Sequence, residues 1–336
     1  MHNVTLIKGD GIGPSIMDAA VAVINASGAK INWHEAEAGM AAYERTGTPL
    51  PDATMESIAQ TRVAFKGPLT TMVGEGFRSI NVELRKQYDL YANVRPAKSW
   101  KGVKTRYDDV DIVIVRENTE GLYVGLEHYL TPAKDIAESL AVVTKAGSER
   151  IVEYAFKYAI DNDRKKVTVC HKANILKYTQ GLFLRAAREV AARYPDIEFD
   201  EKIVDAACMH MVMKPEQFDV VVTTNMFGDI LSDLTAGLVG GLGLIPGANI
   251  GADAALFEAV HGSAPDIAGK NIANPTAVMM GGVMMLNHLG EHEAAVRMLN
   301  AIEKVVNGGV YVTPDLNAGS KYGTKEMGQA IVDAMS

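Results

Sequence analysis

Cysteine is scarce in this chain, and its sequence contains no long apolar run. The 336 residues include two cysteines, Cys170 and Cys208, which stand in apolar surroundings and lack the spacing of a metal site. We therefore expect small core residues in a reducing compartment. No stretch of about 18 apolar residues occurs, which excludes a membrane-spanning helix. The start, residues 1–7, lacks the basic region and cleavage site of a signal peptide, so we predict a cytoplasmic location.

Basic clusters and the common nucleotide-binding motifs are also missing. The formal net charge is −8 and no basic stripe occurs, which argues against a nucleic-acid surface. The glycines of residues 9–14 do not match G-x-G-x-x-G, so this segment predicts a tight strand-to-helix turn. No G-x-x-x-x-G-K-[ST] segment occurs, which disfavours a Mg²⁺-dependent phosphotransferase.

What the sequence does contain is an alternation of β-branched runs with amphipathic helical patterns. Hydrophobic residues make up 48% and charged residues 22%, as in a soluble globular protein, and the length suggests two domains. The alternation predicts a largely parallel α/β architecture. Residues 257–270 are too rich in glycine, proline and small residues for a helix or a central strand, so we expect an ordered ligand-binding loop there. The expected strands are 4–7, 62–67, 111–116, 167–171, 198–204 and 218–224, and the main helices are 14–26, 79–86, 148–160, 178–193, 225–239, 276–288, 291–306 and 324–335.

Polar residues follow several of these strands, at the edge where open α/β sheets bind ligands. Lys172 and Asp205 each follow a strand, and Asp229 and Asp233 lie in the helix after another. Four residues apart, the last two carboxylates share one helix face, an arrangement that suits Mg²⁺ or Mn²⁺. An acidic face at a helix start, favoured by the helix dipole, is the alternative that spacing alone prefers.

Three arginines, Arg85, Arg95 and Arg116, stand at or near the ends of apolar elements. Arginine is the preferred partner of planar carboxylates because its fork binds them through two hydrogen bonds. Taken singly, each is more simply explained as a surface residue.

Several of these stretches together resemble the β-decarboxylating dehydrogenase family, which contains isocitrate, homoisocitrate and 3-isopropylmalate dehydrogenases. Each motif alone is weak, but their joint occurrence in this order is specific and covers nearly the whole chain. The NAD-dependent isocitrate dehydrogenases are the most similar branch. The matching stretches are 9–14, 79–85, 91–96, 116–123, 171–174, 225–233, 258–269 and 274–276.

The resemblance implies a two-domain open α/β isopropylmalate-dehydrogenase-like fold outside the usual Rossmann cofactor mode. Its domains, 1–98 plus 245–336 and 99–244, would flank a cleft. The family also implies a homodimer, possibly a higher oligomer, with shared active sites. Lys172 and Asp205 would enter the partner's site, and an arm at 118–141 would clasp the partner.

The implied reaction is the metal-dependent oxidative decarboxylation of isocitrate to 2-oxoglutarate and CO₂ with reduction of NAD, a step of the tricarboxylic acid cycle. By the same resemblance, Lys172 removes the hydroxyl proton or relays it, and Tyr123 protonates the enol carbon. Mg²⁺ or Mn²⁺ would be held by Asp205, Asp229 and Asp233. The substrate would contact Ser79, Asn81, Arg85, Arg95 and Arg116. The cofactor would contact Thr71, Glu258, His261, Gly262, Ser263, Ala264, Asp266, Ile267 and Asn274.

The choice of substrate and cofactor depends on a few positions. Ser79, also a plausible helix N-cap, and Asn81 are polar and suit the third carboxylate of isocitrate; homoisocitrate and 3-isopropylmalate remain alternatives. Asp266 can accept hydrogen bonds from a ribose and repels a 2′-phosphate, which predicts NAD over NADP. NADP-using relatives add phosphate-binding residues near the positions of Pro314 and Ala318, where this chain has neither tyrosine nor arginine. A non-catalytic regulatory subunit is the alternative of another class, disfavoured because the catalytic and metal residues are present.

Overall fold

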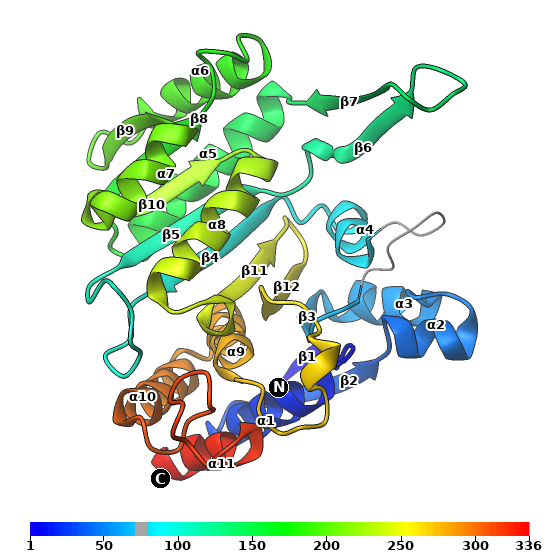
Figure 1. Cartoon of the computed structure of the whole chain (residues 1–336), viewed down its shortest axis with the longest axis vertical. Helices are drawn as coiled ribbons and strands as arrows, with labels where there is room; N and C mark the ends of the chain where they lie inside the picture. The colour runs from blue at the N-terminus through cyan, green and yellow to red at the C-terminus, as the bar shows by residue number, and fades with distance from the viewer. Residues whose placement is uncertain (71–78, 336) are drawn as a thin grey trace. The chain divides into compact units, whose positions relative to one another are not determined.

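The computed structural model describes residues 1–70 and 79–335 and divides into two compact units (Figure 1). Unit 1 comprises Met1–Tyr88, Ser99–Asp108 and Ala236–Ser336, and unit 2 comprises Asp89–Lys98 and Asp109–Thr235. These units differ from the predicted domains in three short segments, 89–98, 99–108 and 236–244. The first of them belongs to unit 2 because its strand pairs along its whole length with the strand that begins at Asp111.

Five strands of unit 1 lie side by side in the order β2-β1-β3-β12-β11. All neighbours are parallel except β11 and β12, which are antiparallel. The strands are β1 (His2–Ile7), β2 (Ile31–Ala36), β3 (Val63–Lys66), β11 (Pro246–Ile250) and β12 (Ala255–Ala259). The helices are α1 (Gly13–Ala26), α2 (Met40–Thr46), α3 (Asp52–Thr61), α4 (Ile80–Gln87), α9 (Thr276–His288), α10 (His292–Gly308) and α11 (Thr324–Ala334), with short 3₁₀ turns at Leu242–Leu244 and Pro265–Ile267.

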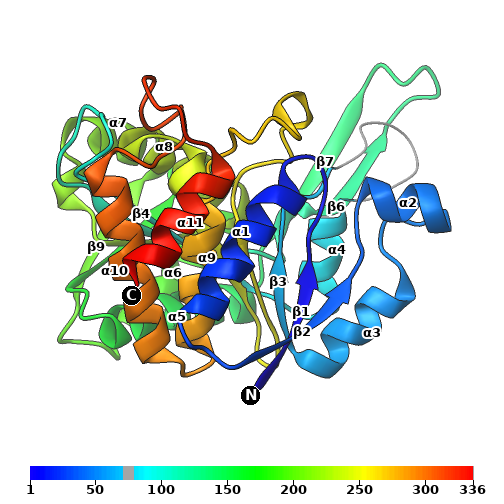
Figure 2. The ribbon, with the colours of Figure 1, turned by 90° about the horizontal axis from the view of Figure 1, so that it is seen from below.

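The core of unit 1 forms where α9 packs against α1 and against β11 and β12, while α10 and α11 cover α9 and α1 (Figure 2). Nine residues of α9 are buried, so this helix is apolar on most of its surface. β12 corrects one expectation, because the sequence predicts no central strand within 257–270. Its five residues are all buried between β3 and β11, and a strand covered on both faces shows no alternation of polar and apolar residues.

In unit 2, five strands lie side by side in the order β4-β5-β10-β8-β9. β4 runs antiparallel to β5, and the other neighbours are parallel. The strands are β4 (Ala92–Lys98), β5 (Asp111–Glu117), β8 (Lys166–His171), β9 (Glu198–Ile203) and β10 (Val220–Thr223). The helices are α5 (Lys145–Asp161), α6 (Thr179–Ala191), α7 (Val204–Met213) and α8 (Asn225–Val239), with a 3₁₀ turn at Pro215–Gln217.

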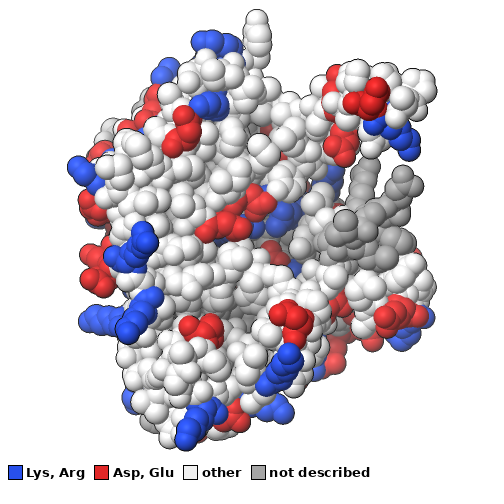
Figure 3. Space-filling model, in the orientation of Figure 1, with Lys and Arg blue, Asp and Glu red and all other residues white. Residues whose placement is uncertain are grey.

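The predicted arm is a separate antiparallel hairpin of β6 (Gly121–Tyr129) and β7 (Ala137–Val142), which projects from unit 2 in Figure 1. Most of its residues are exposed, including the cross-strand neighbours Leu126 and Leu140. Figure 3 shows charged side chains of both signs at its tip and interspersed over the face in view. Within the described residues, no helix has both the length and the apolarity to cross a bilayer.

Candidate functional site

Strand register brings three predicted site residues of unit 2 to one place. Arg116 lies near the end of β5, next to Thr223 at the end of β10, and β10 leads directly into α8 with Asp229 in its second turn. β4 supplies Arg95 from the other side of β5. The first turns of α8 therefore lie over the two arginines.

Asp229 is the centre of this cluster. Its Oδ1 accepts hydrogen bonds from Arg116 Nη1 and, at 3.2 Å, from Arg95 Nη1, and its Oδ2 accepts one from the Tyr123 hydroxyl at 2.6 Å. The Arg116 guanidinium lies 5.0 Å from the centre of the Tyr123 ring. Burial and the hydrogen bond to Asp229 raise the pKa of Tyr123, so its phenol stays protonated near neutral pH. Tyr123 therefore holds a proton beside two cations.

Residues that the sequence argument did not single out hold the two arginines in place. Arg116 is 1% exposed and donates from Nε and Nη2 to Asn225 Oδ1 at 3.0 and 2.7 Å. Arg95 donates from Nη1 to Ser232 Oγ at 2.7 Å. Asn225, Asp229 and Ser232 are spaced by four and three residues, so a search for polar residues on the helix face of Asp229 would have found them.

Asp233 completes the acidic pair on α8. Its pKa is raised by desolvation and by the negative charge of Asp229, against the opposing charges of Arg95 and Arg116. Two carboxylates one turn apart are suitable ligands for a hard divalent cation, which would relieve their repulsion. No three His, Cys, Asp or Glu side chains gather as a metal site within the described part of one chain. The predicted third ligand, Asp205 of the partner subunit, stays a prediction.

Lys172 and Asp205 form a second pair in unit 2. They follow the parallel neighbours β8 and β9, and Lys172 Nζ donates to Asp205 Oδ1. This hydrogen bond lowers the pKa of Asp205. The two side chains are 27% and 67% exposed, so both are open to groups outside the chain.

In unit 1, the predicted cofactor residue Glu258 belongs to a buried ion pair. Lys66 on β3 and Glu258 on β12 are register partners, and Nζ lies 2.8 Å from Oε2. Asn249 donates to Oε1, also at 2.8 Å. Burial raises the pKa of Glu258, but the charges of Lys66 and Arg85 outweigh it and lower the pKa to about 2. Sequence reasoning missed Lys66, although a lysine ending an apolar strand before a glycine-rich loop was a visible signal.

The loop after β12 is fastened to the turn after β1. Ile12 N–H donates to the Ser263 carbonyl at 2.9 Å, and a side chain at Gly11 would collide with that oxygen at 2.0 Å, which explains this glycine. Ser263 and Thr70 share a hydrogen bond of 2.7 Å between their hydroxyls. The pKa of His261 is lowered by burial, so its ring is neutral near pH 7, and its buried Nε2 has no hydrogen-bond partner among the described residues.

The remaining cofactor predictions lie further along this loop. Asp266 and Ile267 are in the 3₁₀ turn, with the Asp266 side chain exposed. Gly262 is exposed, and Ala264 takes a left-handed conformation with φ of 38°. Thr71 lies outside the described residues.

Asn274 is committed to structural contacts. Its Oδ1 accepts from the Thr276 N–H and hydroxyl at the start of α9, and its Nδ2 donates to Asp315 Oδ2 at 2.9 Å. Any contact of Asn274 with the cofactor would have to use the second Nδ2 hydrogen or the backbone groups.

Ser79, Asn81 and Arg85 lie at the start of α4 or on it. Ser79 occupies the N-cap position, but its side chain makes no capping hydrogen bond, so the expected capping role is not taken. Asn81 Oδ1 is buried without a hydrogen-bond partner among the described residues. Arg85 is buried near enough to Glu258 to lower its pKa.

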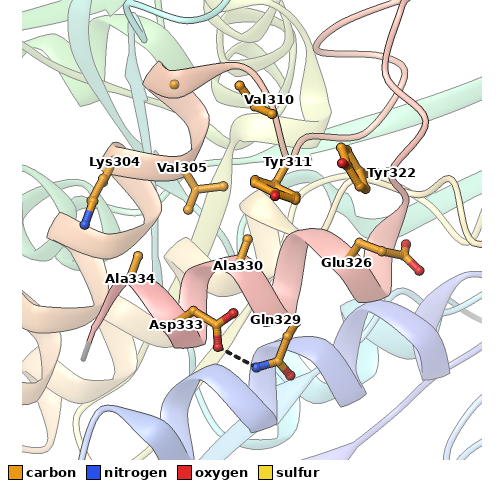
Figure 4. Close-up of a pocket in the computed structure, with 11 residues that line it drawn as sticks. Lys304, Val305, Val310, Tyr311, Tyr322, Glu326, Gln329, Ala330, Asp333 and Ala334 are labelled. Atoms are coloured by element: carbon orange, nitrogen blue, oxygen red, sulfur yellow. Dashed lines mark hydrogen bonds between the residues drawn. The ribbon is translucent and has the colours of Figure 1, made fainter.

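A groove of about 660 Å³ between α10 and α11 lies apart from these residues (Figure 4). Tyr311 and Tyr322 line it with ring centres 4.6 Å apart, and Gln329 donates to Asp333 at 2.8 Å. None of the predicted site residues lines it.

Comparison with known proteins identifies the family. The model of the isocitrate/isopropylmalate dehydrogenase family matches residues 3–331. The chain belongs to this family. The resemblance and the fold expected from it are therefore confirmed, as is the expectation that the protein is a dehydrogenase of this family.

Three relatives illustrate the range of similarity. The crystal structure of isocitrate dehydrogenase from Methylococcus capsulatus is 63% identical, with a TM-score of 0.97 over 100% of this chain and 99% of that one. An Arabidopsis thaliana mitochondrial NAD isocitrate dehydrogenase catalytic subunit is 50% identical over 98% of this chain and 87% of its own. A Solanum tuberosum chloroplastic 3-isopropylmalate dehydrogenase is 50% identical over 91% and 85%.

The relatives also correct one prediction. Further curated NAD isocitrate dehydrogenase relatives, at 47% to 48% identity, are named alpha or regulatory subunits, and all are mitochondrial. The predicted cytoplasmic location is therefore wrong by this comparison. Absence of a recognisable leader in residues 1–7 was too weak a basis for it.

Proposed function

We propose that this protein catalyses the metal-dependent oxidative decarboxylation of isocitrate to 2-oxoglutarate and CO₂, with reduction of NAD. The observation that carries the proposal is the cluster of Arg95, Arg116, Tyr123 and Asp229 in unit 2. It combines two carboxylate-binding cations, one protonated phenol and one metal-binding carboxylate. An isocitrate dehydrogenase of 63% identity supports the same substrate.

Each side chain has a task in this reaction. The guanidinium groups of Arg95 and Arg116 bind and orient the substrate carboxylates. Lys172 of the partner subunit removes the hydroxyl proton or relays it during hydride transfer to the nicotinamide. Tyr123 gives its proton to the carbon that CO₂ leaves. Its raised pKa keeps the phenol protonated until that step.

Asp229 and Asp233, with Asp205 of the partner subunit, would hold Mg²⁺ or Mn²⁺. When bound, such an ion would supply a Lewis acid for the substrate oxygen that is oxidised. Cofactor choice follows from Asp266, whose exposed carboxylate suits ribose hydroxyls and repels a 2′-phosphate. The neutral His261, whose Nε2 has no hydrogen-bond partner in the described part of the chain, offers a further hydrogen bond to the cofactor. We expect kcat/KM with NAD to exceed that with NADP.

The strongest alternative substrate is 3-isopropylmalate, because a Solanum tuberosum 3-isopropylmalate dehydrogenase is 50% identical to this chain. Ser79 and Asn81 favour isocitrate. The Ser79 hydroxyl is not used to cap α4, and the Asn81 amide, whose oxygen has no hydrogen-bond partner among the described residues, can turn its NH₂ toward a carboxylate. The test is kcat/KM with isocitrate, homoisocitrate and 3-isopropylmalate under identical conditions. Isocitrate should be preferred, and a preference for either rival would overturn the proposal.

We also propose a catalytic homodimer with shared sites rather than a regulatory subunit. The exposed arm β6–β7 and the exposed Lys172–Asp205 pair support it. The purified chain alone should turn over substrate. Mixing the inactive variants Lys172→Met and Tyr123→Phe should restore about a quarter of wild-type activity, since about half of re-formed dimers are mixed and each has one intact site. No restoration after verified subunit exchange would refute shared sites.

A further inference from the structure

Glu117 is a buried carboxylate to which the proposed reaction gives no role. It is the last residue of β5, directly after Arg116, and is 3% exposed. No ion pair joins it to a basic side chain within the described residues. A buried carboxylate without a cation is costly, so its hydrogen bonds should indicate what it does.

All of these hydrogen bonds come from the turn that follows β5. Glu117 Oε1 accepts from the Thr119 N–H at 2.9 Å and from the Thr119 hydroxyl at 2.7 Å, and Oε2 accepts from the Glu120 N–H at 2.8 Å. The chain therefore wraps around its own preceding carboxylate. Burial raises the pKa of Glu117, while these three donors oppose the shift.

The turn lies between two residues of the proposed site. Arg116 precedes it and Tyr123 follows it on β6, yet both must reach Asp229. The turn is also tied to the Asp229 helix, because Asn225 Nδ2 donates to the Glu120 carbonyl at 3.1 Å while Asn225 Oδ1 accepts from Arg116. The path of the turn thus sets where Tyr123 stands relative to Arg116.

A second set of contacts holds the turn from outside. Arg150 on α5 donates to the Thr119 hydroxyl at 3.0 Å, and its guanidinium is anchored by Asp89 at 2.7 Å. The Glu120 carboxylate accepts from the Thr144 N–H at the start of α5 at 2.9 Å. The turn would therefore remain attached to the sheet without Glu117, but its three inner donors would have no acceptor.

We propose that Glu117 is a positioning residue for the reaction, acting through the turn at 118–120 to set the Tyr123 hydroxyl against Asp229. This inference rests on the proposed role of Tyr123. Misplacement of a reacting group by about 1 Å can cost on the order of 100-fold in rate. Loss of the Glu117 carboxylate should therefore reduce kcat while leaving substrate and NAD binding nearly unchanged.

The test is a double-mutant cycle between Glu117→Gln and Tyr123→Phe. In the wild-type background, Glu117→Gln should lower kcat about 10- to 100-fold, with each KM changed by less than about threefold. In the Tyr123→Phe background the same substitution should have almost no further effect, because the group that it positions is already gone. Equal losses in both backgrounds would overturn the inference and indicate a merely structural role.

A milder pair of variants keeps the test valid should Glu117→Gln fail to fold. Thr119→Val removes one donor to Glu117 and should lower kcat, whereas Thr119→Ser keeps the hydroxyl and should restore it. Asp219→Asn is the matched control. Its carboxylate likewise accepts backbone N–H groups, from Lys165 and Lys166, but at the opposite ends of the strands. It should affect stability without affecting kcat.

The cycle uses whichever of the three hydroxy acids the wild-type enzyme turns over fastest, so a wrong substrate assignment does not affect it. An unchanged kcat in Tyr123→Phe would instead refute the proposed role of Tyr123, and with it this inference.

Discussion

The buried pair Lys66–Glu258 allows a quantitative prediction. Lys66 is 1% and Glu258 7% exposed. Lys66→Met leaves the carboxylate buried without its cation, a change that costs about 3–5 kcal/mol of unfolding free energy. The depressed pKa of Glu258, about 2 against an ordinary 4.5, has the same direction, because the charges of Lys66 and Arg85 favour the ionised carboxylate in the folded chain.

The effect of pH follows from the direction of that shift. Because the pKa of Glu258 is lowered, its contribution to stability is fully present above pH 4.5 and is lost as pH falls toward about 2. In Lys66→Met burial acts with less opposition, which raises the pKa and allows the carboxyl to take up a proton. The stability difference between variant and wild type should therefore be largest near neutral pH and shrink below pH 4.5.

Urea unfolding followed by tryptophan fluorescence is the assay. Trp33 and Trp100, the two tryptophans of the sequence, both belong to unit 1. The double variant Lys66→Met/Glu258→Gln keeps an acceptor for Asn249 and should recover most of the loss. Arg45→Met, which breaks an exposed pair with Glu37, should change stability little. A loss below about 1 kcal/mol for Lys66→Met, or no recovery in the double variant, would refute the reasoning.

Three further predictions concern catalysis. Tyr123→Phe should lower kcat about 10²- to 10⁴-fold with little change in either KM, as steady-state kinetics would show, because the proton donor is removed; a kcat within about threefold of wild type would contradict this role. Gly228→Ala should reduce activity because its Cβ would lie 2.5 Å from Arg116 Cγ, whereas Gly237→Ala on the same helix has open space and should leave activity unchanged; equal activities of the two variants would count against a fixed Arg116. Chelation should abolish turnover and added Mg²⁺ or Mn²⁺ restore it, and Asp233→Asn should weaken Mn²⁺ binding measured by electron paramagnetic resonance; full activity after thorough chelation would end the metal proposal.

The sequence predicted the strand ends well because each was a β-branched run followed by a polar residue. β5, β8 and β10 are buried on both faces, and Arg116, Lys172 and Asn225 stand where such runs stop. The local pattern suffices to predict where these strands end, because a short run of adjacent apolar residues indicates a buried strand.

The contacts of the site could not be read from the sequence. That Arg95 and Arg116 both reach Asp229 depends on β4 and β10 flanking β5, and β10 lies more than 100 residues after β5 in the sequence. Lys66 opposite Glu258 likewise requires the register of β3 and β12. β12 itself was missed because glycine and proline after residue 260 obscured a short strand of small apolar residues. Pairing partners, rather than local propensity, carry the missing information.

The hydrogen bonds to Asp229 must partly break before Asp229 can bind a metal ion. In this structure Arg95 and Arg116 neutralise Asp229, and Tyr123 occupies its other oxygen, whereas no side chain within the described residues donates a hydrogen bond to Asp233. Asp229 can serve a cation fully only if at least one of these donors turns away. A hydroxy acid offers carboxylates to which both arginines can turn, and this would free Asp229 oxygen for the metal. Metal and acid should therefore bind more tightly together than either does alone, with Asp233 supplying the larger share of metal affinity before the acid arrives.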